Sequence, residues 1–85
     1  MAKAGVLGAG SWGTALALLL DKNGHDVTVW SIDQAEVEML DREREHKSKL
    51  PGVKLPQTMK FTNEIQEAIT DQDFMVLAVP SRSEE

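Results

Sequence analysis

The segment that most restricts the fold lies at residues 8–13, which read Gly-Ala-Gly-Ser-Trp-Gly and match the spacing G-x-G-x-x-G. A short apolar run at 3–7 precedes these glycines, and a strongly apolar segment at 11–23 follows them. Strand, glycine turn and helix in this order are typical of a βαβ unit that binds a dinucleotide. The same glycines could form an ordinary turn, but the flanking strand and helix favour the dinucleotide interpretation.

Each part of this turn has a predicted task. Gly8 allows a tight turn out of the strand, Gly10 leaves room for a pyrophosphate beside the backbone, and Gly13 lets the helix approach closely. We expect the free N–H groups near Ser11, Trp12 and Gly13 to face an anion, because they lie at the positive end of the helix. The large Trp12 side chain either shields the pyrophosphate or covers the helix, and the sequence leaves this open.

A carboxylate follows the second predicted strand, at 26–30. Asp33 lies 20 residues after Gly13, the spacing of the acid that binds the adenosine ribose. Asp33 is also a good N-cap, and both roles are compatible because ligands bind at the carboxyl ends of the strands. A carboxylate here would repel a 2′-phosphate, and residues 27–38 include no Lys or Arg. The predicted cofactor is therefore NAD, with NADP less favoured.

Alternation of helix and strand continues along the chain. We predict helices at 33–45 and 63–70, a loop at 50–56, and strands at 59–62 and 74–79. Asp33 with Glu36 has the capping-box spacing at the start of one helix. Asn63 with Gln66 has it at the start of the next. The apolar helix at 11–23 and the apolar strand at 74–79 are both expected to be buried on all sides.

The resulting order is β-α-β-α-β-α-β, which predicts an α/β protein with a parallel sheet and right-handed crossovers. The expected architecture is Rossmann-type with strand order 3-2-1-4, the first half of a dinucleotide-binding domain. Residues 1–85 are accordingly assigned to one partial NAD-binding domain, with no substrate domain.

Composition excludes several other classes of protein. The net charge of −5 argues against nucleic-acid and polybasic membrane partners. There is no cysteine, which excludes disulfides, Cys-ligated zinc and a thiol nucleophile. The longest apolar run, 15–20, is far shorter than the roughly 20 residues of a membrane span, so a cytoplasmic location is expected. His25 and His46 lack metal-ligand spacing and are expected to be solvated, so we predict no metal site and no catalytic residue.

Residues 8–17, which read GAGSWGTALA, resemble the fingerprint of the NAD(P)-dependent glycerol-3-phosphate dehydrogenases. Further matches follow in register: VTVW at 27–30, LPGVKLP at 50–56 and VPS at 79–81. The resemblance covers essentially the whole chain. It implies an oxidoreductase that interconverts sn-glycerol 3-phosphate and dihydroxyacetone phosphate by hydride transfer to or from nicotinamide.

The resemblance also implies roles for particular residues. Ser11 and Trp12 match cofactor-contacting positions in the turn, and Ile32 matches another. Bacterial members often carry Arg or His at the position of Ile32, which suits NADP, whereas Ile32 followed by Asp33 is similar to NAD-using members. The catalytic lysines of the family belong to parts outside this sequence. The chain alone is therefore expected to bind nucleotide weakly without catalysis, and a small phosphorylated substrate would bind only to the full-length enzyme.

On this interpretation the sequence is a fragment of an oxidoreductase. Two alternatives stay open: a free-standing nucleotide-binding or sensing module, and the same domain of another NAD-dependent dehydrogenase. The proline-rich loop at 50–56 argues against the second. Because the fragment lacks a fifth strand, the strand at 74–79 is expected to present an unpaired apolar edge and to promote self-association.

Overall fold

The computed structural model of the protein describes residues 2–46 and 52–78, and it has the predicted alternation of strands and helices. In chain order the elements are β1 (Lys3–Leu7), α1 (Ser11–Lys22), β2 (Asp26–Trp30), α2 (Gln34–Glu43), β3 (Lys60–Thr62), α3 (Ile65–Ile69) and β4 (Phe74–Leu77).

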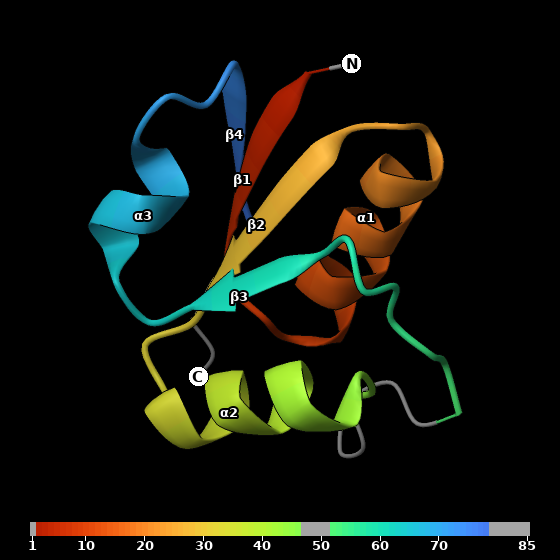
Figure 1. Ribbon diagram of the computed structural model, residues 1–85. Helices are drawn as coiled ribbons and strands as arrows, with labels where there is room; N and C mark the ends of the chain where they lie inside the picture. The colour runs from red at the N-terminus through yellow and green to blue at the C-terminus, as the bar shows by residue number, and fades with distance from the viewer. Residues whose placement is uncertain (1, 47–51, 79–85) are drawn as a thin grey trace.

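The four strands form one parallel sheet in the order β3-β2-β1-β4, which confirms the predicted topology. In the central pair, Lys3 lies opposite Asp26 and Leu7 lies opposite Trp30. All carboxyl ends therefore meet at one edge, the lower edge in Figure 1. Helix α1 covers one face of the sheet, α3 covers the other, and α2 lies below, against β3.

The hydrophobic core is formed by the two central strands together with α1, α2 and the residues that precede β3. Alternate positions of β2 are buried, because the side chains of a strand point to opposite faces in turn, whereas β1 is buried at three consecutive positions, 4–6. The buried hydrophobic residues are Ala4, Val6, Ala9, Ala17, Val27, Val29, Leu40, Leu55, Met59, Ala68 and Ala78. This small core holds the carboxyl-terminal edge of β1 and β2 in place.

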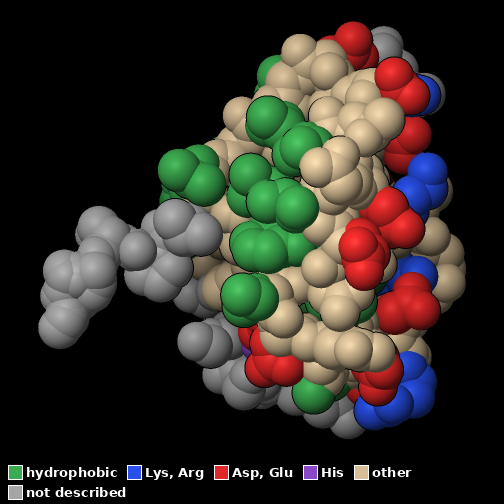
Figure 2. Space-filling model, turned by 90° about the vertical axis from the view of Figure 1, so that its left-hand side faces the viewer, with side chains coloured by type: hydrophobic (Ala, Val, Ile, Leu, Met, Phe, Trp, Pro, Cys, Tyr) green, Lys and Arg blue, Asp and Glu red, His purple; other side chains and the backbone are tan. Residues whose placement is uncertain are grey.

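The prediction that β4 is buried on both faces is wrong. Met75 is 50% exposed and Leu77 is 69% exposed, although β4 pairs with β1 in register. The physical reason is that α1 and α3 pack on the other three strands and leave β4 with little cover. Figure 2 shows hydrophobic side chains gathered on the side of the molecule that carries β4 and α3. The expected last residue of this strand, Val79, lies outside the described residues.

The expectation that α1 is buried on all sides is also wrong. Ala17 is fully buried, whereas Leu19 and Trp12 are more than half exposed. One side of the helix faces β1 and β2, and its opposite side has no covering element within the described residues. The predicted helix at 11–23 is confirmed to within one residue: Lys22 is the last residue of α1, and Gly24 follows with φ +90° in the left-handed region.

The helix starts differ from each other. Asp33 is the N-cap of α2, as predicted. The predicted cap of α3, Asn63 with Gln66, is wrong, because α3 begins at Ile65 and its N-cap residue makes no side-chain cap bond. The hydroxyl of Thr62 instead accepts a hydrogen bond from the Glu64 N–H (3.0 Å), and the strand end orders the approach to the helix.

The loop after α2 is fastened by Arg44. This residue adopts the left-handed conformation (φ 54°), and its carbonyl accepts a hydrogen bond from the Leu55 N–H (2.7 Å). Its guanidinium donates to the carbonyl oxygens of Pro56 (3.2 Å) and Met59 (2.7 Å) and lies over the ring of Phe61. The described part of the predicted loop, 52–56, is therefore irregular but held against α2 and β3.

Candidate functional site

The glycine turn joins the end of β1 to the start of α1 at the carboxyl-terminal edge of the sheet. Gly8 has φ +123°, a conformation that residues with a Cβ rarely adopt, and its N–H donates to the Trp30 carbonyl (2.9 Å). A Cβ placed on Gly13 would lie 2.1 Å from the Gly8 carbonyl oxygen. Helix α1 thus approaches the turn so closely that only glycine fits at residue 13.

Gly10 has a different environment from Gly13. A Cβ placed on Gly10 would meet no protein atom within 4 Å, so the space beside it is open. The first hydrogen bond of α1 runs from the Thr14 N–H to the Gly10 carbonyl (2.9 Å). No acceptor for the N–H groups of Trp12 and Gly13 is found among the described residues, and the first turn of α1 has no acidic residue. Such an open helix start suits an anion.

Asp33 stands at the neighbouring strand end. Its Oδ1 accepts hydrogen bonds from the N–H groups of Ala35 (3.0 Å) and Glu36 (3.3 Å). Because both bonds reach the same oxygen, Oδ2 remains an acceptor for a ligand, and capping does not exclude ribose binding. Ile32, beside it, is 83% exposed. The side chains at 32 and 33 therefore both face solvent at this edge.

The sheet register brings the two predicted parts of the site to the same edge. Leu7 and Trp30 are paired, so the glycine turn leaves β1 where the Ser31–Asp33 segment leaves β2. Trp12 is exposed at the start of α1, also at this edge. The structure therefore places the predicted residues of the turn next to the predicted carboxylate, on an open surface.

Two cavities lie outside the glycine turn. One has a volume of about 260 Å³ and is lined by residues that include Lys3, Thr28 and Gln72. The other has a volume of about 490 Å³ and is lined by residues that include Asp21 and His25. The first cavity extends along β3 as far as Thr62, the second lies at the amino-terminal edge of the sheet, and neither contains a residue predicted for the site.

The expectation that both histidines are solvated is wrong. His46 is 1% exposed, and its Nε2 lies 2.8 Å from Oε2 of Glu36. His25 is partly buried: its Nδ1 accepts a hydrogen bond from the Ala2 N–H (3.2 Å), and its ring meets Phe74 edge to face. The error for His46 arose from its charged sequence neighbours, which say nothing of the contacts that a loop makes after it folds back.

Sequence reasoning also missed Ser31, which is buried directly after β2. Its hydroxyl donates to Oε1 of Glu36 (2.6 Å) and accepts from the N–H of Asp33 (3.2 Å). Glu36 thus does not complete the capping box that its spacing indicates. The available signal was a hydroxyl residue at a strand end with a glutamate five residues later, a spacing that recurs at Thr62 and Glu67.

Within residues 2–46 and 52–78, no helix is long and apolar enough to cross a lipid bilayer.

Comparison with known proteins gives a consistent result. Residues 3–84 match the family described as the N-terminus of NAD-dependent glycerol-3-phosphate dehydrogenase. A glycerol-3-phosphate dehydrogenase of Agathobacter rectalis, named for NAD(P)+, is 57% identical over 81 residues, or 95% of this chain and 24% of that protein. A Fusobacterium nucleatum protein of the same name is 49% identical over 83 residues, or 98% of this chain and 25% of that protein.

A solved structure agrees with these sequence matches. The crystal structure of glycerol-3-phosphate dehydrogenase from Coxiella burnetii superposes with a TM-score of 0.87 at 34% sequence identity. The match covers 94% of this chain and 25% of that one. The chain thus spans about a quarter of the length of the relatives that it matches.

Proposed function

The chain belongs to the family of NAD-dependent glycerol-3-phosphate dehydrogenases, whose N-terminal part it matches, and from this membership we propose that it binds the dinucleotide cofactor of such an enzyme. The binding residues are Gly8, Gly10, Ser11, Trp12, Gly13, Ile32 and Asp33. When bound, the nicotinamide cofactor would supply the hydride acceptor or donor.

The open space beside Gly10 is the observation that carries this proposal. A pyrophosphate can approach the backbone there because no side chain intervenes, and the N–H groups of Trp12 and Gly13 are available to it. Gly8 and Gly13 shape the turn, and Oδ2 of Asp33 is free to accept from a ribose hydroxyl. The residues present therefore fit the group that the family implies.

NAD(H) is expected to bind more tightly than NADP(H). Ile32 offers no positive charge to a 2′-phosphate, and the Asp33 carboxylate would repel it. Calorimetric titration of the chain with NADH and NADPH measures the preference. Equal or tighter binding of NADPH would mean that Ile32 and Asp33 do not govern the choice.

The full-length protein that carries this sequence is proposed to interconvert sn-glycerol 3-phosphate and dihydroxyacetone phosphate. We expect no turnover by the 85-residue chain itself, because hydride transfer requires the substrate and the cofactor to be held in register. The assay follows NADH absorbance in the presence of dihydroxyacetone phosphate. Steady NADH consumption by the pure chain would contradict the expectation.

Self-association through β4 is a further part of the proposal. Phe74, Met75 and Leu77 are exposed on a strand that, among the described residues, pairs only with β1. Exposed apolar edges of this kind tend to pair with another chain. Sedimentation over a wide concentration range should show a mass that rises with concentration. The substitution Leu77→Lys should reduce this rise, and Leu19→Lys, on α1, should not; a strict monomer at high micromolar concentration would contradict the proposal.

We also infer a cytoplasmic location and no nucleic-acid partner. The net charge of −5 supports both inferences, because phosphate backbones and anionic lipid surfaces select positively charged proteins. Fractionation of cells that express the protein tests the location, and recovery in the membrane fraction would contradict it.

A further inference from the structure

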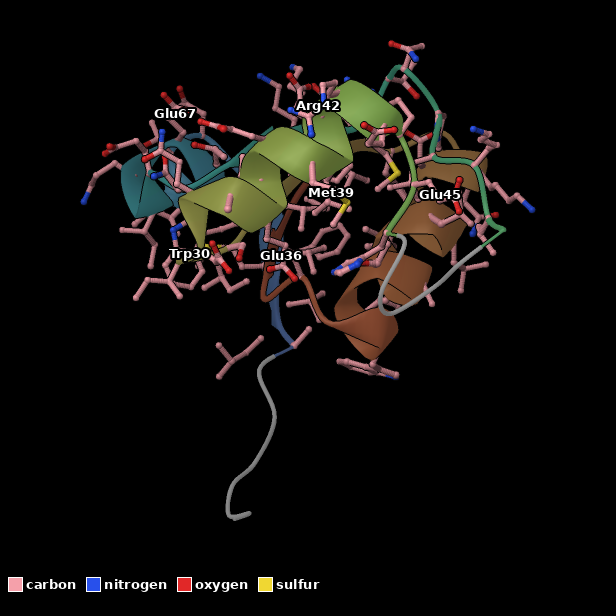
Figure 3. All side chains as sticks on the ribbon, turned by 90° about the horizontal axis from the view of Figure 1, so that it is seen from below. Trp30, Glu36, Met39, Arg42, Glu45 and Glu67 are labelled. Atoms are coloured by element: carbon pink, nitrogen blue, oxygen red, sulfur yellow. The ribbon has the colours of Figure 1, made fainter. Side chains whose placement is uncertain are left out.

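A partly buried chain of polar groups connects the proposed ribose site to the loop that follows α2. It runs from the Asp33 N–H to the Ser31 hydroxyl, on to both carboxylate oxygens of Glu36, and ends at Nε2 of His46. Figure 3 looks onto this edge of the sheet and shows the Glu36 side chain projecting from the first turn of α2. Ser31 and His46 are both buried, so water competes little for these hydrogen bonds.

We propose that His46 is a positioning residue for dinucleotide binding, which acts through Glu36 and Ser31 to hold the Asp33 carboxylate in place for the adenosine ribose. This inference rests on the proposed function. It assigns a task to His46 and Glu36, which are outside the set of proposed binding residues.

The hydrogen-bond directions support this task. A carboxylate only accepts hydrogen bonds, so Glu36 is satisfied when the Ser31 hydroxyl and the His46 ring both donate to it. With its proton directed at Glu36, the Ser31 hydroxyl presents its lone pairs to the Asp33 N–H. The backbone of Asp33 is thereby fixed at its N–H, while its side chain is fixed by the cap bonds to Ala35 and Glu36.

The far end of the network is also anchored. His46 follows Arg44, whose guanidinium holds the carbonyl oxygens of Pro56 and Met59. The ring of His46 therefore sits on a fastened part of the loop rather than on a free segment. The hydrogen bonds of Glu36 therefore connect this loop to the Ser31–Asp33 segment, which carries the proposed ribose contact.

The chain contains a matched control for this network. At the end of β3 the Thr62 hydroxyl accepts from the Glu64 N–H (3.0 Å) and donates to Oε1 of Glu67 (2.8 Å). The arrangement repeats that of Ser31 and Glu36 in spacing and hydrogen-bond type, but it orders the start of α3, on the other side of the sheet. We therefore expect Thr62→Ala to perturb the start of α3 as much as Ser31→Ala perturbs the start of α2, without moving Asp33.

The test compares the affinities of ADP and 2′-deoxy-ADP, which differ by the hydroxyl that Asp33 is proposed to bind. In the unaltered chain we expect ADP to bind roughly 10-fold more tightly. Ser31→Ala and His46→Leu should reduce this preference to below about 3-fold, because the carboxylate is no longer held in place. His46→Gln should restore most of it, since its amide can donate to Glu36 from a similar position. Thr62→Ala should keep the full preference.

The ratio of the two affinities separates positioning from general destabilisation, because a smaller folded fraction lowers both affinities equally. Ser31→Ala removes one hydroxyl and keeps the inference testable even if His46→Leu does not fold. An unchanged preference in folded Ser31→Ala would overturn the inference and leave the proposed function intact, and so would an equal loss in Thr62→Ala. Absence of ADP binding by the unaltered chain would overturn both.

Discussion

Substitution of Gly10 by valine is expected to lower the affinity for NADH by roughly 100-fold or more, a change of about 2.7 kcal/mol in binding free energy. The Cβ at this position points into open space, and the backbone has φ −70°, which valine adopts readily. The added side chain would therefore occupy the volume proposed for the pyrophosphate without disturbing the fold.

The measurement is a calorimetric titration with NADH, accompanied by thermal unfolding. Ala15→Val is a suitable control, since it places the same valine side chain at an exposed position of α1. The midpoint of unfolding should change little in either variant, and only Gly10→Val should lose binding. Full affinity in Gly10→Val would show that the phosphate site lies elsewhere.

Substitution of Gly13 by alanine is expected to reduce the stability of the fold strongly, whereas Gly10→Val should change it little. The new Cβ would lie 2.1 Å from the Gly8 carbonyl oxygen and 3.2 Å from the Ala78 Cβ, so α1 must move away from the turn. Overpacking typically destabilises by about 1–3 kcal/mol, and a clash with backbone places this substitution at the upper end of that range. A domain of this length has only roughly 4–13 kcal/mol of stability in total, so the loss would be severe.

Urea unfolding of Gly13→Ala and Gly10→Ala measures this difference directly. Gly10→Ala adds the same methyl group three residues earlier in the same motif, where no protein atom lies within 4 Å. We expect its free energy of unfolding to change by less than about 1 kcal/mol. Equal stability of the two variants would contradict the assigned role of Gly13 in close packing.

Local sequence signals were sufficient to predict the order and pairing of the elements. An apolar run closed by Gly8 predicted β1, and the apolar segment at 11–23 predicted α1, because each signal acts on its own few residues. Alternating strands and helices then left a parallel sheet with order 3-2-1-4 as the expected arrangement, and the structure has it.

The burial of each element was harder to predict, because it depends on which other elements pack against it. The apolar composition of β4 shows that the strand can be buried, but no described element covers Met75 or Leu77. The cap of α3 was predicted wrongly for a related reason. Thr62 and Asn63 are adjacent, and both side chains could order the start of the helix. The Ser31 N–H donates to the Thr62 carbonyl, and this pairing between strands decides which of the two does so.

The candidate site divides in the same way. Its ligand-facing part follows from glycine spacing and from the distance to Asp33, both of which are properties of one continuous segment. The supporting part does not, because the contact between Glu36 and His46 forms only after α2 ends and the chain turns back. Buried partners of this kind have no periodic signature in a sequence.

The central claim is that a dinucleotide binds at the glycine turn, and chemical-shift mapping with ¹⁵N-labelled chain tests it most directly. Addition of NADH should shift the backbone amide signals of Gly10, Trp12 and Gly13 most strongly, together with those of Ile32 and Asp33. Shifts confined to the cavity at the opposite edge of the sheet, around His25 and Lys60, would contradict the claim, as would the absence of any shift at millimolar NADH.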